Sequence, residues 1–229
     1  MRVKAFTLAE VLITLGIIGI AAAMTLPAII ADYRQNETVS RLKKTYSILN
    51  QSILFAQKDF DLYEYWQTPH EIGKDLHFEK YWKPYLKNIT ICTTARTCNY
   101  SSETPWVYRN GVQVEVGIAG PKVLRQGIYL ADGTFILIGE DNHWTSQSNG
   151  GDQHTQYIWV DVNGYKPPNM MGKDFFRLFI GTHTNKVLPD KIESSEDVVN
   201  AYCSKNSNGT SCAAKIMKDG WKIKDDYPW

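Results

Sequence analysis

The sequence predicts an α+β fold, in which one long N-terminal helix precedes a mostly antiparallel sheet and short C-terminal helices. Three observations predict it. An apolar run and a helical stripe occupy the first 60 residues, short strand-like runs with turn signals follow, and helical patterns return near the end. A segregated order of this kind is typical of α+β domains, whereas α/β domains alternate helices and strands.

The apolar run covers residues 11–31 and is long enough, as a helix, to span the ~30 Å hydrocarbon core of a bilayer. Two basic residues, Arg2 and Lys4, precede it. The positive-inside rule therefore places the N-terminus in the cytoplasm and everything after the run outside. Between residues 6 and 30 the only ionisable side chain is Glu10.

Three interpretations of this N-terminus compete. A secretory signal peptide would use the small residues 21–23 as its cleavage site and leave Met24 as the first residue. The apolar run continues past that site, however, and a carboxylate at Glu10 has no use in a signal peptide. A plain membrane anchor also leaves Glu10 unexplained.

The third interpretation accounts for Glu10. The residues KAFTLAE from Lys4 to Glu10, followed by VLI, resemble the prepilin peptidase signature of type IV pilins and type II secretion pseudopilins. The resemblance implies cleavage after Ala5, an N-methylated Phe6 as the mature N-terminus, and Glu10 as the residue that serves assembly. Ala5 stands where the family usually has glycine, and because alanine is also small, we expect slower cleavage at worst.

This interpretation divides the chain into a leader (1–5), a transmembrane and filament-core helix (6–31), the outer half of the same helix (32–60) and an extracytoplasmic head (61–229). In the outer half, apolar residues recur at helical spacing and form one stripe that can pack under a sheet. A coiled-coil dimer is the alternative, but the stripe is short for one. Its members are Val39, Leu42, Tyr46, Leu49, Ile53, Ala56 and Phe60.

Within the head, Asn110–Gly111 and Asp132–Gly133 each separate two strand-like runs, which predicts two hairpins. Ser194 and Asp197 fit a capping box at the start of a late helix. The remaining elements expected are helical structure over 69–86, a loop over 142–153, strands over 156–162 and 174–180, and the late helix over 194–202.

The four cysteines form two close pairs without the CxxC spacing of redox or zinc sites. An even number of cysteines in an extracytoplasmic chain favours disulfides. We predict Cys92–Cys98 and Cys203–Cys212, although four cysteines allow three connectivities.

The charge and the motifs argue against nucleic-acid binding and catalysis. With 25 basic and 24 acidic residues, the net charge of +1 provides no basic footprint. No HExxH, P-loop, dinucleotide or G-x-S-x-G motif is present. We therefore expect that the chain is not an enzyme and binds no catalytic cofactor. The basic run Arg41–Lys44 is interpreted as a solvated helix face near anionic lipid. The five histidines are expected at the surface: 70, 77, 143, 154 and 183.

One polar turn is a candidate calcium site. Asp161, Asn163 and Asp174 can direct oxygen atoms to one point, as hard cations require. Some secretion pseudopilins carry calcium in a loop of the head, so the resemblance is compatible with a structural ion here. The alternative is a turn held by Asp and Asn side chains, and the fragment lacks the further acidic ligands of an EF-hand.

The expected function is structural, as the resemblance implies. The chain would be a single-pass inner-membrane protein with an extracytoplasmic head, which then joins a cell-surface or periplasmic filament of a type IV pilus or type II secretion system. Its partners would be the membrane, prepilin peptidase and other subunits contacted through the N-terminal helix. The alternatives are a Sec-exported periplasmic binding or enzymatic domain, and a minor pilin whose head binds DNA.

Overall fold

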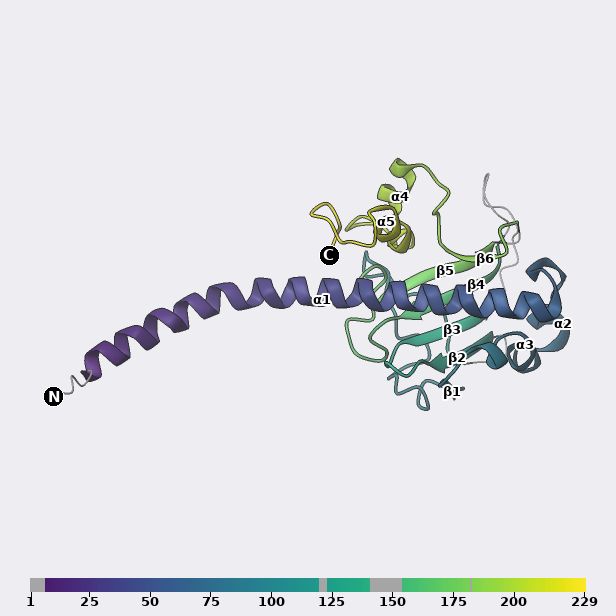
Figure 1. Ribbon diagram of the computed structural model, residues 1–229, viewed down its shortest axis with the longest axis horizontal. Helices are drawn as coiled ribbons and strands as arrows, with labels where there is room; N and C mark the ends of the chain where they lie inside the picture. The colour runs from purple at the N-terminus through teal and green to yellow at the C-terminus, as the bar shows by residue number, and fades with distance from the viewer. Residues whose placement is uncertain (1–6, 120–122, 141–153, 182) are drawn as a thin grey trace. The chain divides into compact units, whose positions relative to one another are not determined.

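The computed structural model describes residues 7–119, 123–140, 154–181 and 183–229 (Figure 1). The chain divides into two compact units, Met1–Glu37 and Thr38–Trp229. The α+β prediction is confirmed, since a long N-terminal helix is followed by a six-stranded antiparallel sheet and short C-terminal helices.

Helix α1 runs from Leu8 to Phe60, a length of 53 residues that includes Pro27. The part within the second unit carries the predicted apolar stripe. Tyr46 and Phe60 are half-buried at the margins of the stripe. The buried positions follow the helical spacing and include three small polar residues: Thr38, Val39, Leu42, Thr45, Leu49, Ser52, Ile53 and Ala56.

The predicted helical structure over 69–86 is present but divided. Gly73 adopts a positive φ of 82° and separates the first two segments, and Pro84 lies in a final 3-10 turn. The short helices of the head are η1 (Tyr63–Tyr65), α2 (Pro69–Ile72), α3 (Lys74–Tyr81), η2 (Lys83–Tyr85), α4 (Glu196–Tyr202) and α5 (Cys212–Lys218).

The predicted start of the late helix is wrong in detail. Helix α4 is capped at Ser195, whose side chain makes no capping hydrogen bond, so Ser194 and Asp197 do not form a capping box. The predicted loop over 142–153 lies outside the described residues. Helix α5 and two strands were not predicted, because elements of three to seven residues are too short to show a clear period.

The sheet is antiparallel throughout, and its strands follow one another in sequence order. The turn at Asp132–Gly133 joins β2 and β3 as predicted, with Gly133 at a φ of 85°. The strands are β1 (Thr90–Cys92), β2 (Leu124–Tyr129), β3 (Phe135–Glu140), β4 (His154–Asp161), β5 (Phe175–Gly181) and β6 (Lys186–Pro189).

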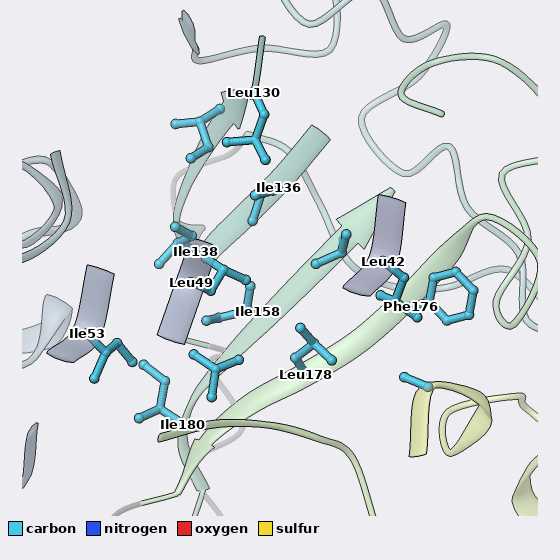
Figure 2. Close-up of a cluster of buried hydrophobic side chains, with 14 of the residues drawn as sticks. Leu42, Leu49, Ile53, Leu130, Ile136, Ile138, Ile158, Phe176, Leu178 and Ile180 are labelled. Atoms are coloured by element: carbon cyan, nitrogen blue, oxygen red, sulfur yellow. The ribbon is translucent and has the colours of Figure 1, made fainter. Parts of the chain in front are cut away.

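One face of the sheet packs against the stripe of α1. Alternate residues of each strand point to this face, and they are mostly apolar. These residues form a single buried cluster with the helix. Figure 2 shows Leu42, Leu49 and Ile53 of α1 near Ile136, Ile138, Ile158, Phe176, Leu178 and Ile180 of the strands.

The opposite face of the sheet is covered by the irregular segment 92–118. There Trp106 stacks on Phe175 with ring centroids 4.5 Å apart, and Val114 is fully buried. The predicted hairpin at Asn110–Gly111 exists only as a small turn with an isolated bridge, outside the six-stranded sheet. Its apolar residues cover the sheet and do not extend it.

The outer edge of β6 is capped by side chains of α1. The Asn50 amide donates to the Val187 carbonyl and accepts from the Val187 N–H, both at 3.1 Å. Gln57 donates to the carbonyl of Asn185 at 2.7 Å. These contacts occupy backbone groups that would otherwise pair with another strand, so they protect this edge from aggregation.

Candidate functional site

The first part of α1 presents an apolar surface. All residues from 7 to 30 are exposed, among them Leu12, Ile17 and Ile20 at 61–63%. Within the part of the chain that the structure describes, α1 is the one helix long and apolar enough to cross a membrane. The hydroxyls of Thr14 and Thr25 donate hydrogen bonds to backbone carbonyls one turn earlier in the helix, at 2.9 and 3.0 Å. Neither threonine therefore adds an unpaired hydroxyl to the apolar surface.

Glu10 forms a capping box with Thr7 at the start of α1. Its carboxylate accepts from the N–H of Thr7 at 2.9 Å and from the Thr7 hydroxyl at 2.8 Å. In return, the Glu10 N–H donates to the Thr7 hydroxyl at 3.3 Å. This role of Glu10 was not predicted, although the T-x-x-E spacing is a recognised helix-start signal. Glu10 therefore has a local partner besides any partner in an assembly.

The other two residues of the predicted processing signature, Ala5 and Phe6, lie outside the described residues. Helix α1 begins at Leu8, two residues after the predicted cleavage point. Cleavage after Ala5 stays a prediction.

Two disulfides join the cysteine pairs expected from the sequence. Cys92–Cys98 closes the loop after β1, and Cys203–Cys212 links the end of α4 to the start of α5. The second disulfide packs against Gly172, where an added Cβ would lie 2.7 Å from the Cys212 sulfur. Gly172 also has a φ of 77°, so both space and backbone conformation require glycine there.

Asp161, the first of the predicted calcium ligands, is completely buried at the end of β4. Its Oδ2 accepts hydrogen bonds from the Tyr100 hydroxyl at 2.9 Å and from the Trp106 indole at 2.7 Å. Burial, and then the nearby charge of Asp174, raise the pKa of Asp161 well above its usual range.

Asp174 holds the turn that precedes β5. Its carboxylate accepts from the N–H groups of Met170 at 2.6 Å and Asn169 at 2.9 Å, and from the Asn163 amide at 3.2 Å. Burial raises the pKa of Asp174 to about 6. The structure thus brings the three predicted residues together, and many of their polar atoms bond to the protein itself.

The fit to a cation is partial. The side-chain oxygens of Asn163 and Asn169 are buried without a hydrogen-bond partner in the described chain. However, no three His, Cys, Asp or Glu side chains form a metal-binding group in the same residues. The hydrogen bonds around Asp174 account for the turn without an ion, so calcium stays a prediction.

Melting of the full chain tests it. If calcium lies among Asp161, Asn163 and Asp174, EDTA lowers the melting temperature and millimolar calcium restores it, because an ion that binds only the folded state stabilises it. Asn163→Asp is the companion variant, since an added carboxylate should strengthen the calcium effect. Equal melting temperatures in EDTA and in calcium would leave a turn held by hydrogen bonds alone.

The prediction that all histidines lie at the surface is wrong for His77, which is 3% exposed on α3. Its Nδ1 lies 2.8 Å from the carbonyl of Gln67, and its Nε2 lies 3.2 Å from the side-chain nitrogen of Gln156. These partners fit a neutral ring that donates from Nδ1 and accepts at Nε2. Desolvation lowers the pKa of His77 to about 4.

The other histidines differ from His77. His70 and His183 are exposed, as predicted, whereas His143 and the side chain of His154 lie outside the described residues. The signal that could have identified His77 is its position within α3, one residue before the buried Phe78, on the face that packs against the sheet.

Comparisons with known proteins add a family and no function. Residues 28–229 match a family of unknown function, DUF6613. No curated protein matches the chain, and no solved structure matches it. The match begins after the processing signature, within the apolar part of α1.

Proposed function

The chain belongs to DUF6613, a family of unknown function, and on that premise we propose from its own residues that it is a structural subunit of a type IV pilus or type II secretion pseudopilus. In this proposal prepilin peptidase cleaves the chain after Ala5 and methylates Phe6. The mature subunit waits in the inner membrane and then joins a helical filament through its N-terminal helix.

The observation that carries the proposal is the lone carboxylate of Glu10 at the start of an exposed apolar helix. A charged side chain in a membrane-spanning segment is costly, about 2.5–3.5 kcal/mol at the bilayer centre, and usually marks a function. Here it follows the sequence KAFTLA, in which the resemblance to prepilins assigns it a role in assembly.

The compartment follows from the same segment. With Arg2 and Lys4 on the cytoplasmic side, the head lies outside the cytoplasm. Two disulfides suit that compartment, because disulfides form and persist in oxidising environments. Tyr33, which is 67% exposed just beyond the apolar run, and its neighbour Arg34 suit the level of the lipid headgroups.

A structural subunit needs no chemistry of its own. Cleavage and methylation belong to the processing peptidase, and the work of extension belongs to an assembly ATPase. Among the described residues, the part of α1 within Met1–Glu37 exposes apolar side chains. In this proposal the membrane, and later other subunits, cover them.

Processing of the N-terminus tests the proposal. We expect the mature chain to begin at N-methyl-Phe6 and to keep 229 − 5 = 224 residues. Intact-mass measurement and N-terminal sequencing of the membrane-extracted protein check this. Ala5→Gly places the family's usual glycine at the cleavage point and should be cleaved at least as fast as the natural chain. Ala5→Ile places a bulky side chain there, so this variant should accumulate uncleaved.

The alternatives give different N-termini. A Sec-exported binding or enzymatic domain would begin at Met24, and a plain anchor would keep Met1. Either result would remove the pilin-like proposal. A minor pilin with a DNA-binding head would also begin at Phe6. It would be distinguished by binding to immobilised DNA at physiological salt.

A further inference from the structure

The head has an exposed apolar and acidic surface where α1 ends, here called the corner patch. It consists of Leu54, Phe55, Asp61, Leu62, Glu64 and Tyr65. Leu54 and Tyr65 are 66% and 67% exposed, and large apolar side chains left exposed on a folded head can mark an interaction site. Residues 58–75 contain two lysines and five acidic residues, and Lys80 lies against Phe60 and Gln67 of this stretch, so the formal charge is 3 − 5 = −2.

A second exposed surface lies on the turn between β4 and β5, here called the loop tip. It consists of Tyr165, Lys166, Pro167 and Pro168, all exposed. Residues 162–173 contain two lysines and no acidic residue, a formal charge of +2. The flanking carboxyl groups, Asp161 and Asp174, are buried and do not offset this charge at the surface.

The loop tip is presented on a firm base. Asp174 accepts two backbone N–H groups and the Asn163 amide beneath it. Gly164 packs so closely that an added Cβ would lie 2.8 Å from the Gly133 carbonyl. A surface held in place loses little conformational entropy on binding, and an exposed tyrosine is a frequent anchor of protein interfaces.

The two surfaces lie at opposite ends of the head. Arg41 donates to the carbonyls of Asp132 and Val162 at 2.9 and 3.1 Å, which fixes the base of the loop tip beside the early part of α1 in the head. The corner patch comprises Leu54 and Phe55 near the end of α1 and residues in the segment 61–65 after it, and this end of α1 lies next to α2 (Figure 1). The 19 residue-to-residue steps from Arg41 to Phe60 span about 28 Å of helix.

We propose that the loop tip of one copy docks onto the corner patch of a second copy of this chain. The charges of +2 and −2 are complementary, and Tyr165 meets the exposed leucine, phenylalanine and tyrosine side chains. Because the two surfaces differ and lie at opposite ends, each copy can use both at once, and such a head-to-tail contact can repeat from copy to copy along a filament. The inference rests on the proposed filament, for which it supplies the contact between heads.

Zero-length coupling of lysine amines to carboxylates tests the contact on the full chain, in filaments sheared from the cells and in the membranes that remain. A mixture of ¹⁴N- and ¹⁵N-labelled copies distinguishes links between copies from links within one. We expect a mixed-isotope link from Lys166 to Asp61 or Glu64. A link within one copy is not expected, because about 28 Å of α1 separates Arg41, beside the base of the loop tip, from Phe60 at the end of the helix.

Charge reversal sharpens the test. Lys166→Glu should reduce the yield of the mixed link at least tenfold, and adding Asp61→Lys and Glu64→Lys to it should restore a link between the same positions. Lys205→Glu is the matched control, because Lys205 is also exposed, on the loop between α4 and α5, and its replacement should leave the link unchanged. Links that map elsewhere, or an unchanged yield in Lys166→Glu, would overturn the proposed contact.

The N-terminus of the same sample separates this inference from the proposed function. If the link is missing and the mature chain begins at Phe6, the contact between heads is wrong and the pilin-like function stands. If the link is missing and the chain begins at Met1 or Met24, both are wrong.

Discussion

Replacing Glu10 by alanine is expected to leave a chain that is cleaved normally but fails to enter filaments. Cleavage exposes the α-amino group of Phe6, which has an ordinary pKa of about 7.7–8.0 and is mostly cationic at pH 7. When helices bundle away from water, the carboxylate of Glu10 needs such a partner, and the amine of a neighbouring subunit can supply it. Removing one member of a buried ion pair costs about 3–5 kcal/mol, so incorporation should fall roughly 100- to 3,000-fold.

The capping box found at Thr7 offers a competing explanation for Glu10, and two further variants separate them. Glu10→Gln keeps an acceptor for the Thr7 N–H but removes the charge, so it should fail like Glu10→Ala. Thr7→Ala weakens the cap by about 1 kcal/mol but keeps the charge, so it should still assemble. The measurement is the amount of processed subunit in sheared filaments relative to the membrane. Normal filaments from cleaved Glu10→Ala would defeat the pairing idea, and normal filaments from Glu10→Gln alone would assign Glu10 to the cap.

The head is expected to lose stability as the pH falls from 6.5 to 4, because His77 must become charged in a buried site. Its pKa is lowered from the usual 6.5 to about 4 by desolvation. A group whose folded pKa is lowered contributes stability that is complete above its unfolded pKa and disappears as the pH falls through the folded value. The free energy of unfolding should therefore drop by about 2 kcal/mol at pH 5 and by about 3 kcal/mol near pH 4.

Chemical denaturation of the full chain in detergent, followed by tryptophan fluorescence, measures this loss. Asp174 acts in the opposite direction, since its raised pKa of about 6 adds stability as the pH falls through that value. The comparison with His77→Gln removes this background: the variant is less stable at pH 7 but should lack the loss assigned to His77. His183→Gln is the control, because that histidine is exposed. A wild-type pH profile in His77→Gln would show that His77 is not the source.

The sequence predicted what depends on local spacing. The stripe from Val39 to Phe60 marked the buried face of α1, and Asp132–Gly133 marked the β2–β3 turn. The turn at Asn110–Gly111 was predicted, but the placement of its flanking residues was not. They cover one face of the sheet instead of extending it, and both arrangements require similar apolar residues. The hydrogen bonds by which Asn50 caps β6 join it to Val187, 137 positions away, and no local sequence pattern predicts such a contact.

By itself, the sequence determined that this protein has an apolar N-terminal helix with a single carboxylate, an α+β head and cysteines in two close pairs. These features follow from composition and from periods of two and 3.6 residues, which are properties of neighbouring positions. Only the tertiary structure decided that His77 and Asp161 are buried, that Asp174 holds a turn, and where the loop tip and corner patch lie on the head. Burial and partnership depend on which distant segments meet, and the free energy of a charge or a hydrogen bond is set by that meeting.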